Sequence, residues 1–374
     1  MSSSFAKFSK VIAEIDLNNL VDNLKNIRQQ VEQAEVIAVV KANAYGHGVI
    51  EVCHRLEEND VKYFAVARMR EAMELDEAGI RGKILIFGRL TEKDLEAAIE
   101  KHFRITLMNL SDLKKIDDLA SRFNQKAFVH INIDTGMGRV GIFPQQVDEL
   151  IRGMKAMKNI EFEGLYSHFS TSDTADKSFA RLQIERFIAV TKKIAESSIT
   201  FPMVHMANSG AILDLPETWQ GIFNAVRPGI MLYGCYPSVE TSESVAIKPV
   251  MTLKTKVVEI RELEAGQPVS YGLRYYTKTK EKIAVLPIGY ADGIARIFTN
   301  KGRVLINGRL YSIVGTVTMD QIMVRVDERV KEGDEVIFWG NNEKMRPSDV
   351  AERVGTIAYE LCTGITTRVL KNYI

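Results

Sequence analysis

One lysine stands where a buried strand is expected to end. Lys41 directly follows residues 36–40, a short apolar run rich in β-branched side chains that is typical of a fully buried strand. From position alone, an ordinary solvated surface lysine is the more common outcome. Ala42 and Ala44, however, leave room for a bulky group beside Lys41. A lysine held there and partly desolvated is suited to Schiff-base chemistry with an aldehyde.

Further polar side chains follow the same strand or other expected strands: Tyr45 after the first, and Arg139, His168, Asn208, Ser209 and Arg227 after later ones. If these strands form a parallel barrel, their carboxyl ends meet at one rim and the side chains converge there. The loops after the last two strands of such a barrel often bind phosphate, and backbone N–H groups of Ser209, Gly229 and Ile230 could do so here. A Schiff-base lysine and a phosphate site on one rim indicate pyridoxal 5′-phosphate (PLP), which needs both anchors.

The elements that must position these residues alternate regularly. After a helical pattern that begins near Leu17 and is capped by Asp16, apolar runs alternate with amphipathic stretches from residue 36 to residue 229. About eight strand–helix repeats in roughly 220 residues predict an N-terminal (β/α)8 TIM-like barrel of the α/β class. The alternative is a doubly wound open sheet, but no G-x-G-x-x-G motif follows the first expected strand.

The pattern changes beyond residue 240, where short strands and turn signals replace helical periodicity. Asn307 and Gly308 form the two-residue signal of a β-hairpin between two such strands. We therefore expect a mainly β C-terminal domain. The expected boundaries are residues 12–240 for the PLP-binding barrel and residues 241–374, together with 1–11, for the β-strand-rich domain.

Composition limits the class of protein. The chain has 374 residues, 46% hydrophobic and 26% charged, which is ordinary for a soluble protein of two domains. A net charge of +1 gives no reason to expect nucleic acid or an anionic membrane as a partner. Cys53, Cys235 and Cys362 lack metal-ligand spacing, and the N-terminus lacks the apolar core of a signal peptide. We therefore expect a cytoplasmic protein with no metal and no disulfide framework.

Seven short segments occur in the order found in one known family. They are residues 13–17, 40–48, 134–139, 226–230 with 232–234, 269–272, 289–293 and 319–321. Through them the sequence resembles the alanine racemases, PLP enzymes of fold-type III, over essentially the whole chain. The resemblance implies interconversion of L- and D-alanine, which supplies D-alanine for peptidoglycan. It also implies a head-to-tail homodimer whose active sites are shared between the subunits.

The resemblance implies roles for residues of the rim. Lys41 would bind the aldehyde of PLP and act as one proton-transfer base, and Tyr271 would reach the site from the β-domain of a partner subunit as the other. Two bases suit racemisation because the proton leaves one face of the substrate and arrives on the other. Tyrosine has an unperturbed pKa of about 10, so His168 and Arg227 would assist it through a hydrogen-bonded chain. Arg227 would also contact the pyridine nitrogen, where a group that only donates disfavours protonation and weakens the electron sink.

The remaining implied contacts concern the cofactor and the substrate. The cofactor would be bound by Lys41, Tyr45, His168, Asn208, Ser209, Arg227, Gly229, Ile230 and Tyr359. The substrate carboxylate would meet Arg139 and, across the subunit interface, the backbone of Met319 beside Asp320. Tyr290 would line the opening through which the substrate reaches the site.

Two positions depart from the family pattern. Asn132 stands where many relatives carry a lysine modified to a carbamate that braces the arginine, and Thr318 stands where a cysteine is common. A neutral amide cannot supply the negative charge of a carbamate. We expect no carbamylated lysine at this position, and Arg139 held either by the side-chain oxygen of Asn132 or by a bound anion such as chloride. His47, in the loop after Lys41, is left without an assigned role.

Three alternative functions remain to be compared with alanine racemisation. A racemase of another small amino acid, such as serine, would use the same residues. A fold-type III amino-acid decarboxylase would share the architecture but uses an acidic residue at the pyridine nitrogen, where this chain has Arg227. A non-catalytic PLP-binding protein would resemble the barrel alone and would lack the β-domain that carries Tyr271.

Overall fold

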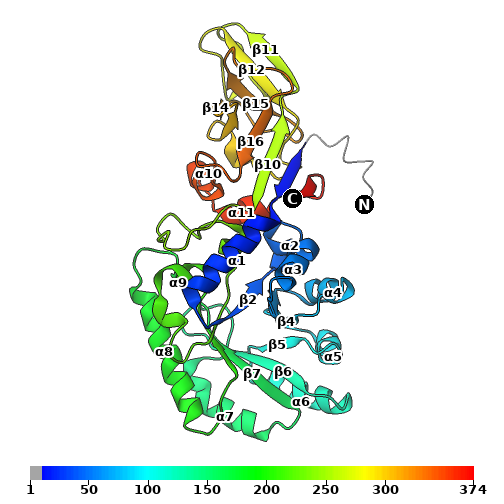
Figure 1. Cartoon of the computed structure of the whole chain (residues 1–374), viewed down its shortest axis with the longest axis vertical. Helices are drawn as coiled ribbons and strands as arrows, with labels where there is room; N and C mark the ends of the chain where they lie inside the picture. Colours follow the sequence, from blue (N-terminus) through cyan, green and yellow to red (C-terminus); the bar gives the residue numbers. More distant parts are fainter. Residues whose placement is uncertain (1–10) are drawn as a thin grey trace.

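The computed structural model describes residues 11–374 as two adjoining parts, a closed barrel and a separate β-sheet (Figure 1). Residues 1–10, which were assigned to the β-rich domain, lie outside the described residues. One cluster of buried apolar side chains runs through both parts, so they are packed against each other. Among residues 11–374, no helix combines the length and the apolar character needed to cross a membrane.

Eight parallel strands close the barrel in chain order. They are β2 (Glu35–Val39), β3 (Tyr63–Val66), β4 (Lys83–Ile86), β5 (Arg104–Leu107), β6 (Ala127–Asn132), β7 (Ile160–Tyr166), β8 (Met203–His205) and β9 (Ala225–Val226). The barrel closes where β9 pairs with β2, with Val36 opposite Val226. Most strand residues are buried, because one face lines the barrel interior and the other packs under helices. The predicted TIM-like barrel is confirmed.

Helices follow the strands around the outside of the barrel (Figure 1). They are α1 (Leu17–Val31), α3 (Val49–Glu57), α4 (Met69–Glu77), α5 (Glu92–Glu100), α6 (Asp112–Arg122), α7 (Val147–Ala156), α8 (Ser178–Ala195) and α9 (Ser209–Asp214). Asp16 caps α1 as predicted, because its carboxylate accepts hydrogen bonds from the N–H groups of Asn18 and Asn19.

The second part is a nine-stranded sheet with the order β11-β12-β15-β14-β13-β16-β10-β1-β17. Its C-terminal strands are β10 (Met251–Lys256), β11 (Glu259–Leu263), β12 (Glu281–Leu286), β13 (Arg303–Ile306), β14 (Arg309–Ile313), β15 (Ile322–Val326), β16 (Glu335–Trp339) and β17 (Leu370–Tyr373). Asn307 and Gly308 have φ angles of 48° and 75° in the β13–β14 turn, as a type I′ hairpin requires. The mainly β C-terminal region is confirmed.

The N-terminal boundary of the expected barrel is wrong in detail. The sequence places residues 12–15 with the barrel, but they form β1 (Ile12–Ile15) of the second sheet. This strand pairs antiparallel with β10 and parallel with β17. Ala13 and Ile15 are buried while their neighbours are half-buried, so one face of the strand packs on the core of that sheet. The division at residue 240 stays a prediction.

Two short helices, α10 (Pro347–Val354) and α11 (Ala358–Thr363), interrupt the β-rich part. Figure 1 shows α11 between the sheet and the barrel, where it contacts the segment after β2. This position brings Tyr359 from the C-terminal region to the barrel rim.

Candidate active site

A cavity of about 400 Å³ opens at the carboxyl ends of the barrel strands. Its volume is within the range of cofactor sites. The residues predicted for the rim gather around it: Lys41, Tyr45, Arg139, His168, Asn208, Ser209, Arg227, Gly229, Ile230 and Tyr359. Lys41, Arg139 and Arg227 make it positive, and no carboxylate of the described chain lines it. Such a cavity suits an anionic ligand.

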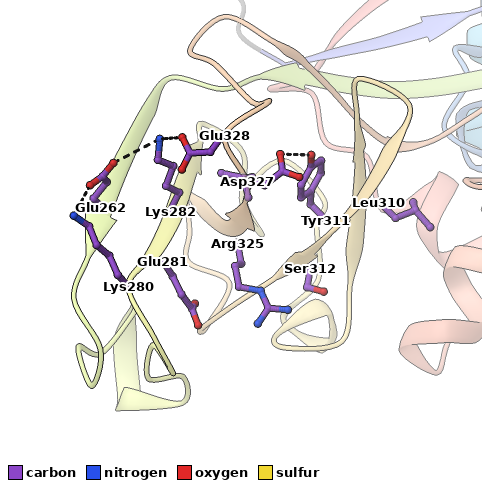
Figure 2. A pocket seen from close by; sticks show the side chains of 11 residues that line it. Glu262, Lys280, Glu281, Lys282, Leu310, Tyr311, Ser312, Arg325, Asp327 and Glu328 are labelled. Carbon is purple, nitrogen blue, oxygen red and sulfur yellow. Dashed lines mark hydrogen bonds and ion pairs between the residues drawn. The ribbon is translucent and has the colours of Figure 1, made fainter.

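A different hollow, of about 430 Å³, lies on the second sheet (Figure 2). Its charged side chains pair with one another: Lys282 pairs with Glu262 and Glu328, and Lys280 also pairs with Glu262. Because these charges offset each other, this hollow lacks the excess of one sign that distinguishes the barrel cavity.

The chain turns sharply after Lys41, and the turn brings two site residues together. Residues 42–45 have φ angles of 53°, 55°, 52° and 51°, so they form a left-handed turn where the sequence predicts a loop. This conformation costs a non-glycine residue roughly 1–2 kcal/mol, so surrounding contacts must stabilise it. As a result, Lys41 and Tyr45 both face the cavity.

Two side chains hold this turn through its backbone. Glu71 Oε1 accepts a hydrogen bond from the N–H of Ala42 at 2.6 Å. His47 Nδ1 lies 3.0 Å from the carbonyl oxygens of both Ala44 and Tyr45. Carbonyl oxygens only accept, so Nδ1 must carry the hydrogen. His47 therefore has a structural position in the turn, although the sequence suggests no role for it.

Lys41 is suited to act as a neutral amine. Burial lowers its pKa below the ordinary lysine value, and the charges of Arg139 and Arg227 lower it further, while Glu71 opposes them. The deprotonated amine is the form that attacks an aldehyde, so this environment favours Schiff-base formation.

A second group of cavity residues forms a candidate anion site, called the anion site below. Ser209 Oγ accepts hydrogen bonds from the N–H groups of Gly229 at 3.0 Å and Met231 at 3.4 Å, so these donors converge. Position 229 requires glycine, because an added Cβ would lie 2.5 Å from the hydroxyl oxygen of Tyr45. Ser209 also begins α9, whose N-terminus favours negative charge. These donors fit a phosphate and Lys41 fits an aldehyde, so the cavity fits PLP.

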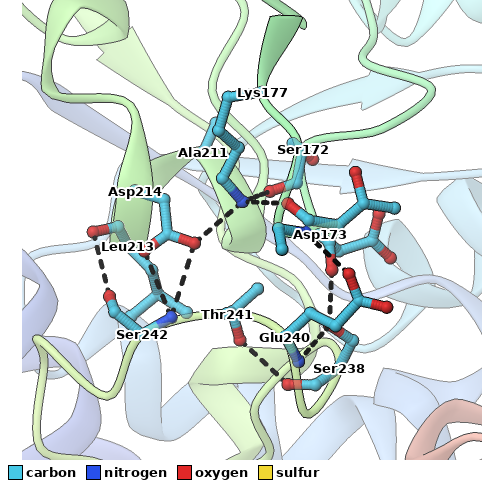
Figure 3. A network of polar contacts seen from close by, with 12 residues as sticks. Ser172, Asp173, Lys177, Ala211, Leu213, Asp214, Ser238, Glu240, Thr241 and Ser242 are labelled. Carbon is cyan, nitrogen blue, oxygen red and sulfur yellow. Dashed lines mark hydrogen bonds and ion pairs between the residues drawn. The ribbon is translucent and has the colours of Figure 1, made fainter.

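A polar network outside the cavity supports α9 (Figure 3). Lys177 Nζ donates to the carbonyl of Ser172 at 2.8 Å and pairs with Asp214 of α9 at 2.9 Å. Ser172 Oγ donates to Asn208 Oδ1 at 2.8 Å, and the same oxygen caps α9 by accepting from the N–H of Ala211. The loop after β7 is therefore tied to the helix that begins at the anion site.

Arg227 follows β9 and is only 4% exposed. Its Nη1 donates to His205 Nδ1 at 2.7 Å, and its Nη2 donates to the carbonyl of Ser167 at 2.8 Å. The same Nη2 lies 3.4 Å from His168 Nδ1, and the guanidinium lies over the ring of Tyr166. Burial lowers the pKa of Arg227 to about 10, so it stays charged at neutral pH. Burial, together with Arg227, lowers the pKa of His168 to about 3, so this imidazole is neutral.

Asn132 and Arg139 both line the cavity, but no hydrogen bond within residues 11–374 joins the two side chains. Asn132 is buried at the end of β6, opposite Tyr166 of β7, whereas the side chain of Arg139 is exposed. Of the two partners expected for Arg139, the side-chain oxygen of Asn132 is therefore not bonded to it. A bound anion beside Arg139 stays a prediction.

Two family models match the chain, the alanine racemase N-terminal domain over residues 15–237 and the alanine racemase C-terminal domain over residues 250–373. The chain belongs to the alanine racemase family. The alanine racemase of Clostridium perfringens is 43% identical to it over 369 residues, which are 97% of this chain and 95% of the relative.

Solved structures of the family have the same fold. The alanine racemase of Clostridium difficile 630 is 40% identical, with a TM-score of 0.91, over 98% of this chain and 96% of the other. The alanine racemase of Bartonella henselae, solved with covalently bound pyridoxal phosphate, is 30% identical, with a TM-score of 0.89, over 98% of this chain and 100% of the other. The expected family and its PLP dependence are thereby confirmed.

Four residues that the family pattern implies do not line the barrel cavity: Tyr271, Tyr290, Met319 and Asp320. Tyr271 is 76% exposed and Met319 is 51% exposed on the second part of the chain. Asp320 pairs with Arg368 at 2.9 Å. Tyr271 instead lines a separate hollow of about 670 Å³ on that part. Within one chain, the structure does not bring Tyr271 to Lys41.

The polar residues that lie beneath the barrel cavity were not predicted from the sequence. Glu163, His130 and His205 are buried in β7, β6 and β8, and Tyr166 lines the cavity itself. A signal for them exists, because they are polar side chains within otherwise apolar strand runs. Burial of such a group is unfavourable unless it has a partner.

Proposed function

We propose that this protein is an alanine racemase that interconverts L- and D-alanine with PLP bound in the barrel cavity. The observation that carries the proposal is Arg227, a buried donor that shares one cavity with Lys41 and with the anion site at Ser209. No carboxylate of the described residues lines this cavity, which favours a racemase over a decarboxylase with an acidic residue at the pyridine nitrogen. The names of the relatives support alanine as the substrate.

The chemistry that PLP supplies when bound is an electron sink that makes the Cα proton of the substrate removable. Lys41 would hold the cofactor and would then accept or return that proton at Nζ. Burial lowers the pKa of Lys41, which increases the neutral fraction that can accept a proton. Arg139, on the same cavity, would orient the substrate carboxylate.

The second base in this proposal is Tyr271 of another copy, so the active form is a homodimer with two shared sites. Racemisation needs proton transfer on both faces of the substrate, and Tyr271 does not line the cavity of its own chain. Its exposed ring is accompanied by other exposed apolar side chains of the same part, including Leu273, Tyr276 and Met319. Exposed apolar patches of this kind are typical of subunit interfaces. Tyr290 and the backbone of Met319 would complete the substrate site.

We place this reaction in the cytoplasm, where D-alanine would supply peptidoglycan synthesis. The three cysteines, Cys53, Cys235 and Cys362, are buried and free, which fits a reducing compartment.

Coupled detection of D-alanine formed from L-alanine tests the proposed function. L-serine and L-lysine are measured alongside at the same concentrations of protein and PLP. We expect kcat/KM for alanine to exceed that for serine by about 10-fold or more, because an added hydroxyl is rejected by roughly this factor in an apolar pocket. Faster turnover of serine would favour the second racemase function. Absence of turnover together with absence of cofactor absorption would exclude both.

A further inference from the structure

A chain of ionisable side chains extends from Arg227 into the barrel interior, and the proposed reaction does not use it. It comprises His205 of β8, His130 of β6 and Glu163 of β7, which pairs with Arg104 of β5. The two histidines are completely buried, and Glu163 and Arg104 are nearly so. Burial of so many polar groups is unfavourable unless their hydrogen bonds are satisfied, so their arrangement requires an explanation.

Hydrogen-bond chemistry gives this chain one direction. The guanidinium of Arg227 can only donate, and its Nη1 is 2.7 Å from His205 Nδ1, so that nitrogen accepts and the ring hydrogen is on Nε2. His205 Nε2 is 3.0 Å from His130 Nδ1, which must then accept. The hydrogen of His130 is therefore on Nε2, 3.3 Å from Glu163 Oε2. Each group donates to the next, from Arg227 to Glu163.

The carboxylate at the end of the chain remains charged. Glu163 Oε2 accepts from Arg104 Nε at 2.8 Å, and Oε1 lies 3.3 Å from Lys83 Nζ. Hydrogen bonds from His130 and Arg104 outweigh burial and hold the pKa of Glu163 well below its ordinary value. Burial also lowers the pKa of both His130 and His205, so the imidazoles between the two charges are neutral.

The barrel backbone is shaped around these rings. An added Cβ at Gly164 would lie 2.2 Å from His130 Nδ1, so β7 has glycine where the imidazole passes. The β6–β7 pairing shifts its register between Val129 and His130. On the other side, the ring of Tyr166 stacks on His205 with a centroid distance of 4.9 Å and an angle of 6°. The two imidazoles are therefore held in position by close packing.

We propose that Glu163 and His130 are positioning residues that act through His205 to hold Arg227 as a charged donor beneath the cofactor. This inference rests on the proposed function. A carboxylate behind an imidazole fixes its tautomer and makes its other nitrogen a stronger acceptor. His205 Nδ1 therefore orients Nη1 of Arg227, and Glu163 acts on Arg227 through the hydrogen bonds of the two histidines. Through these hydrogen bonds, the properties of the cofactor site depend on Glu163, deep in the barrel.

The decisive variant is Glu163→Gln, which keeps the shape and an acceptor oxygen but removes the charge. We expect kcat for L-alanine to fall about 10-fold to 100-fold, as for other groups that orient a site residue from behind, with a smaller change in KM. We also expect the pH at which the visible absorption of the bound cofactor changes to shift downward, because a charge that favours protonation is lost. Glu163→Asp should restore part of both properties.

The matched control is Glu14→Gln in β1, which breaks the partly buried pair of Glu14 with Lys254, 2.8 Å apart, in the other sheet. It should lower the melting temperature without changing the cofactor spectrum or its pH dependence. If Glu163→Gln also lowers only the melting temperature and leaves the cofactor spectrum unchanged, the hydrogen-bonded side chains have only a structural role and the inference is wrong. His130→Asn, which can accept from His205 but is too short to reach Glu163, gives a second route to the same spectral shift if Glu163→Gln does not fold.

Nitrogen-15 NMR of histidine-labelled holoenzyme tests the direction itself. The ring hydrogen is expected on Nε2 of both His130 and His205. A hydrogen on Nδ1 of His205 would contradict the order of donors and acceptors from Arg227 to Glu163. The inference and the proposed function can fail separately. If the wild-type protein does not racemise alanine but Glu163→Gln still shifts the cofactor spectrum, the function is wrong and the positioning stands.

Discussion

Arg227 and Tyr271 belong to two halves of the proposed site that differ in their surroundings. Arg227 is 4% exposed and donates to both side-chain and backbone acceptors, whereas Tyr271 is 76% exposed on the second part of the chain. The barrel half is thus organised within a single chain, and the Tyr271 half is not. In the proposed function, cofactor binding therefore belongs to one chain, while complete proton transfer requires two. Mutations should therefore separate these two properties.

The largest effect should come from mixing variants of the two halves. Lys41→Ala and Tyr271→Ala should each be inactive, because each removes one of the two bases. Since each site of the proposed homodimer combines Lys41 of one copy with Tyr271 of the other, a heterodimer should retain one intact site. An equal mixture should therefore recover up to about a quarter of wild-type activity after subunit exchange. Racemase assays on the mixture, with exchange verified by mass spectrometry of tagged subunits, check this. No recovery despite exchange would contradict shared sites.

A smaller loss is expected when only the phenolic hydroxyl is removed. Tyr271→Phe should lower kcat by about 10²-fold to 10⁴-fold, the range for loss of one general acid–base group. Binding of PLP should change little, because the residues proposed to hold the cofactor, Lys41 and those of the anion site, come from the barrel. The measurements are steady-state kinetics and titration of the cofactor absorption.

The control for this variant is Tyr276→Phe, because Tyr276 is another exposed tyrosine of the same part. It should change kcat by no more than about twofold, as expected for a surface substitution that removes no catalytic group. Equal losses in both variants would mean that the hydroxyl of Tyr271 has no special role.

In the barrel half, substitution of His47 should have the opposite pattern of effects. It should weaken binding of the cofactor and leave the second base in place. His47 holds the left-handed turn through Nδ1, while its buried Nε2 has no hydrogen-bond partner among the described residues. Asparagine can place an amide nitrogen near the position of Nδ1, whereas glutamine places it nearer that of Nε2. His47→Gln should therefore weaken PLP binding about 10-fold, equivalent to one lost buried hydrogen bond, and His47→Asn should weaken it less.

Equilibrium titration of each apo-variant with PLP gives the two affinities. Thermal unfolding of the same samples shows whether folding accounts for the change. Equal affinities for the asparagine and glutamine variants would show that the hydrogen bond to the turn does not set cofactor binding.

Much of the barrel half follows from the sequence, because its signals are local. Apolar runs predict the strands, Asp16 predicts the start of α1, and the position of Lys41 after a strand places it on the rim. The left-handed turn at residues 42–45 does not follow, because none of them is glycine and the contacts that stabilise it come from side chains of Glu71 and His47. The contact between Asn132 and Arg139, one of two alternatives expected for Arg139, is absent because Asn132 is buried at the end of β6 while Arg139 is exposed in the loop that follows.

Less of the other half could be predicted, because its contacts join distant parts of the sequence. β1 (Ile12–Ile15) pairs with β10 (Met251–Lys256) and with β17 (Leu370–Tyr373), both of which are far from it in the sequence. Tyr359 reaches the cavity only because α11 packs between the sheet and the barrel. The resemblance to a family gives Tyr359 and Tyr271 their expected roles, while no local pattern around either residue does. The barrel has one such feature as well. The hydrogen-bonded side chains from Arg227 to Glu163 come from β6, β7, β8 and the segment after β9, which only the closed barrel brings together.

The smallest expected effect is on how the free energy of unfolding changes in acid, which should depend on the barrel half. All six histidines lie in the barrel half of the sequence, and four of them, His47, His130, His168 and His205, have a pKa lowered by burial. A histidine whose folded pKa is below its unfolded value of about 6.5 binds a proton more readily in the unfolded chain. Stability is therefore full above this pH and is lost as the pH falls below it, by up to about 1.4 kcal/mol per pH unit for each group. For His47, whose folded pKa is about 4, the loss continues down to that pH.

His47→Asn removes one such group, so its unfolding free energy should fall less than that of the wild type when the pH is lowered. Between pH 7.5 and 6 the difference should be a little under about 1 kcal/mol, because the unfolded histidine is only partly protonated there. Urea unfolding at the two pH values measures it. The control is His54→Asn, the same substitution at an exposed histidine of α3, which shows whether loss of a histidine side chain alone accounts for the change. If His47→Asn keeps the wild-type pH response, the neutral buried state of His47 is wrong, and with it the assignment of its hydrogen to Nδ1 as the only bound proton of the ring.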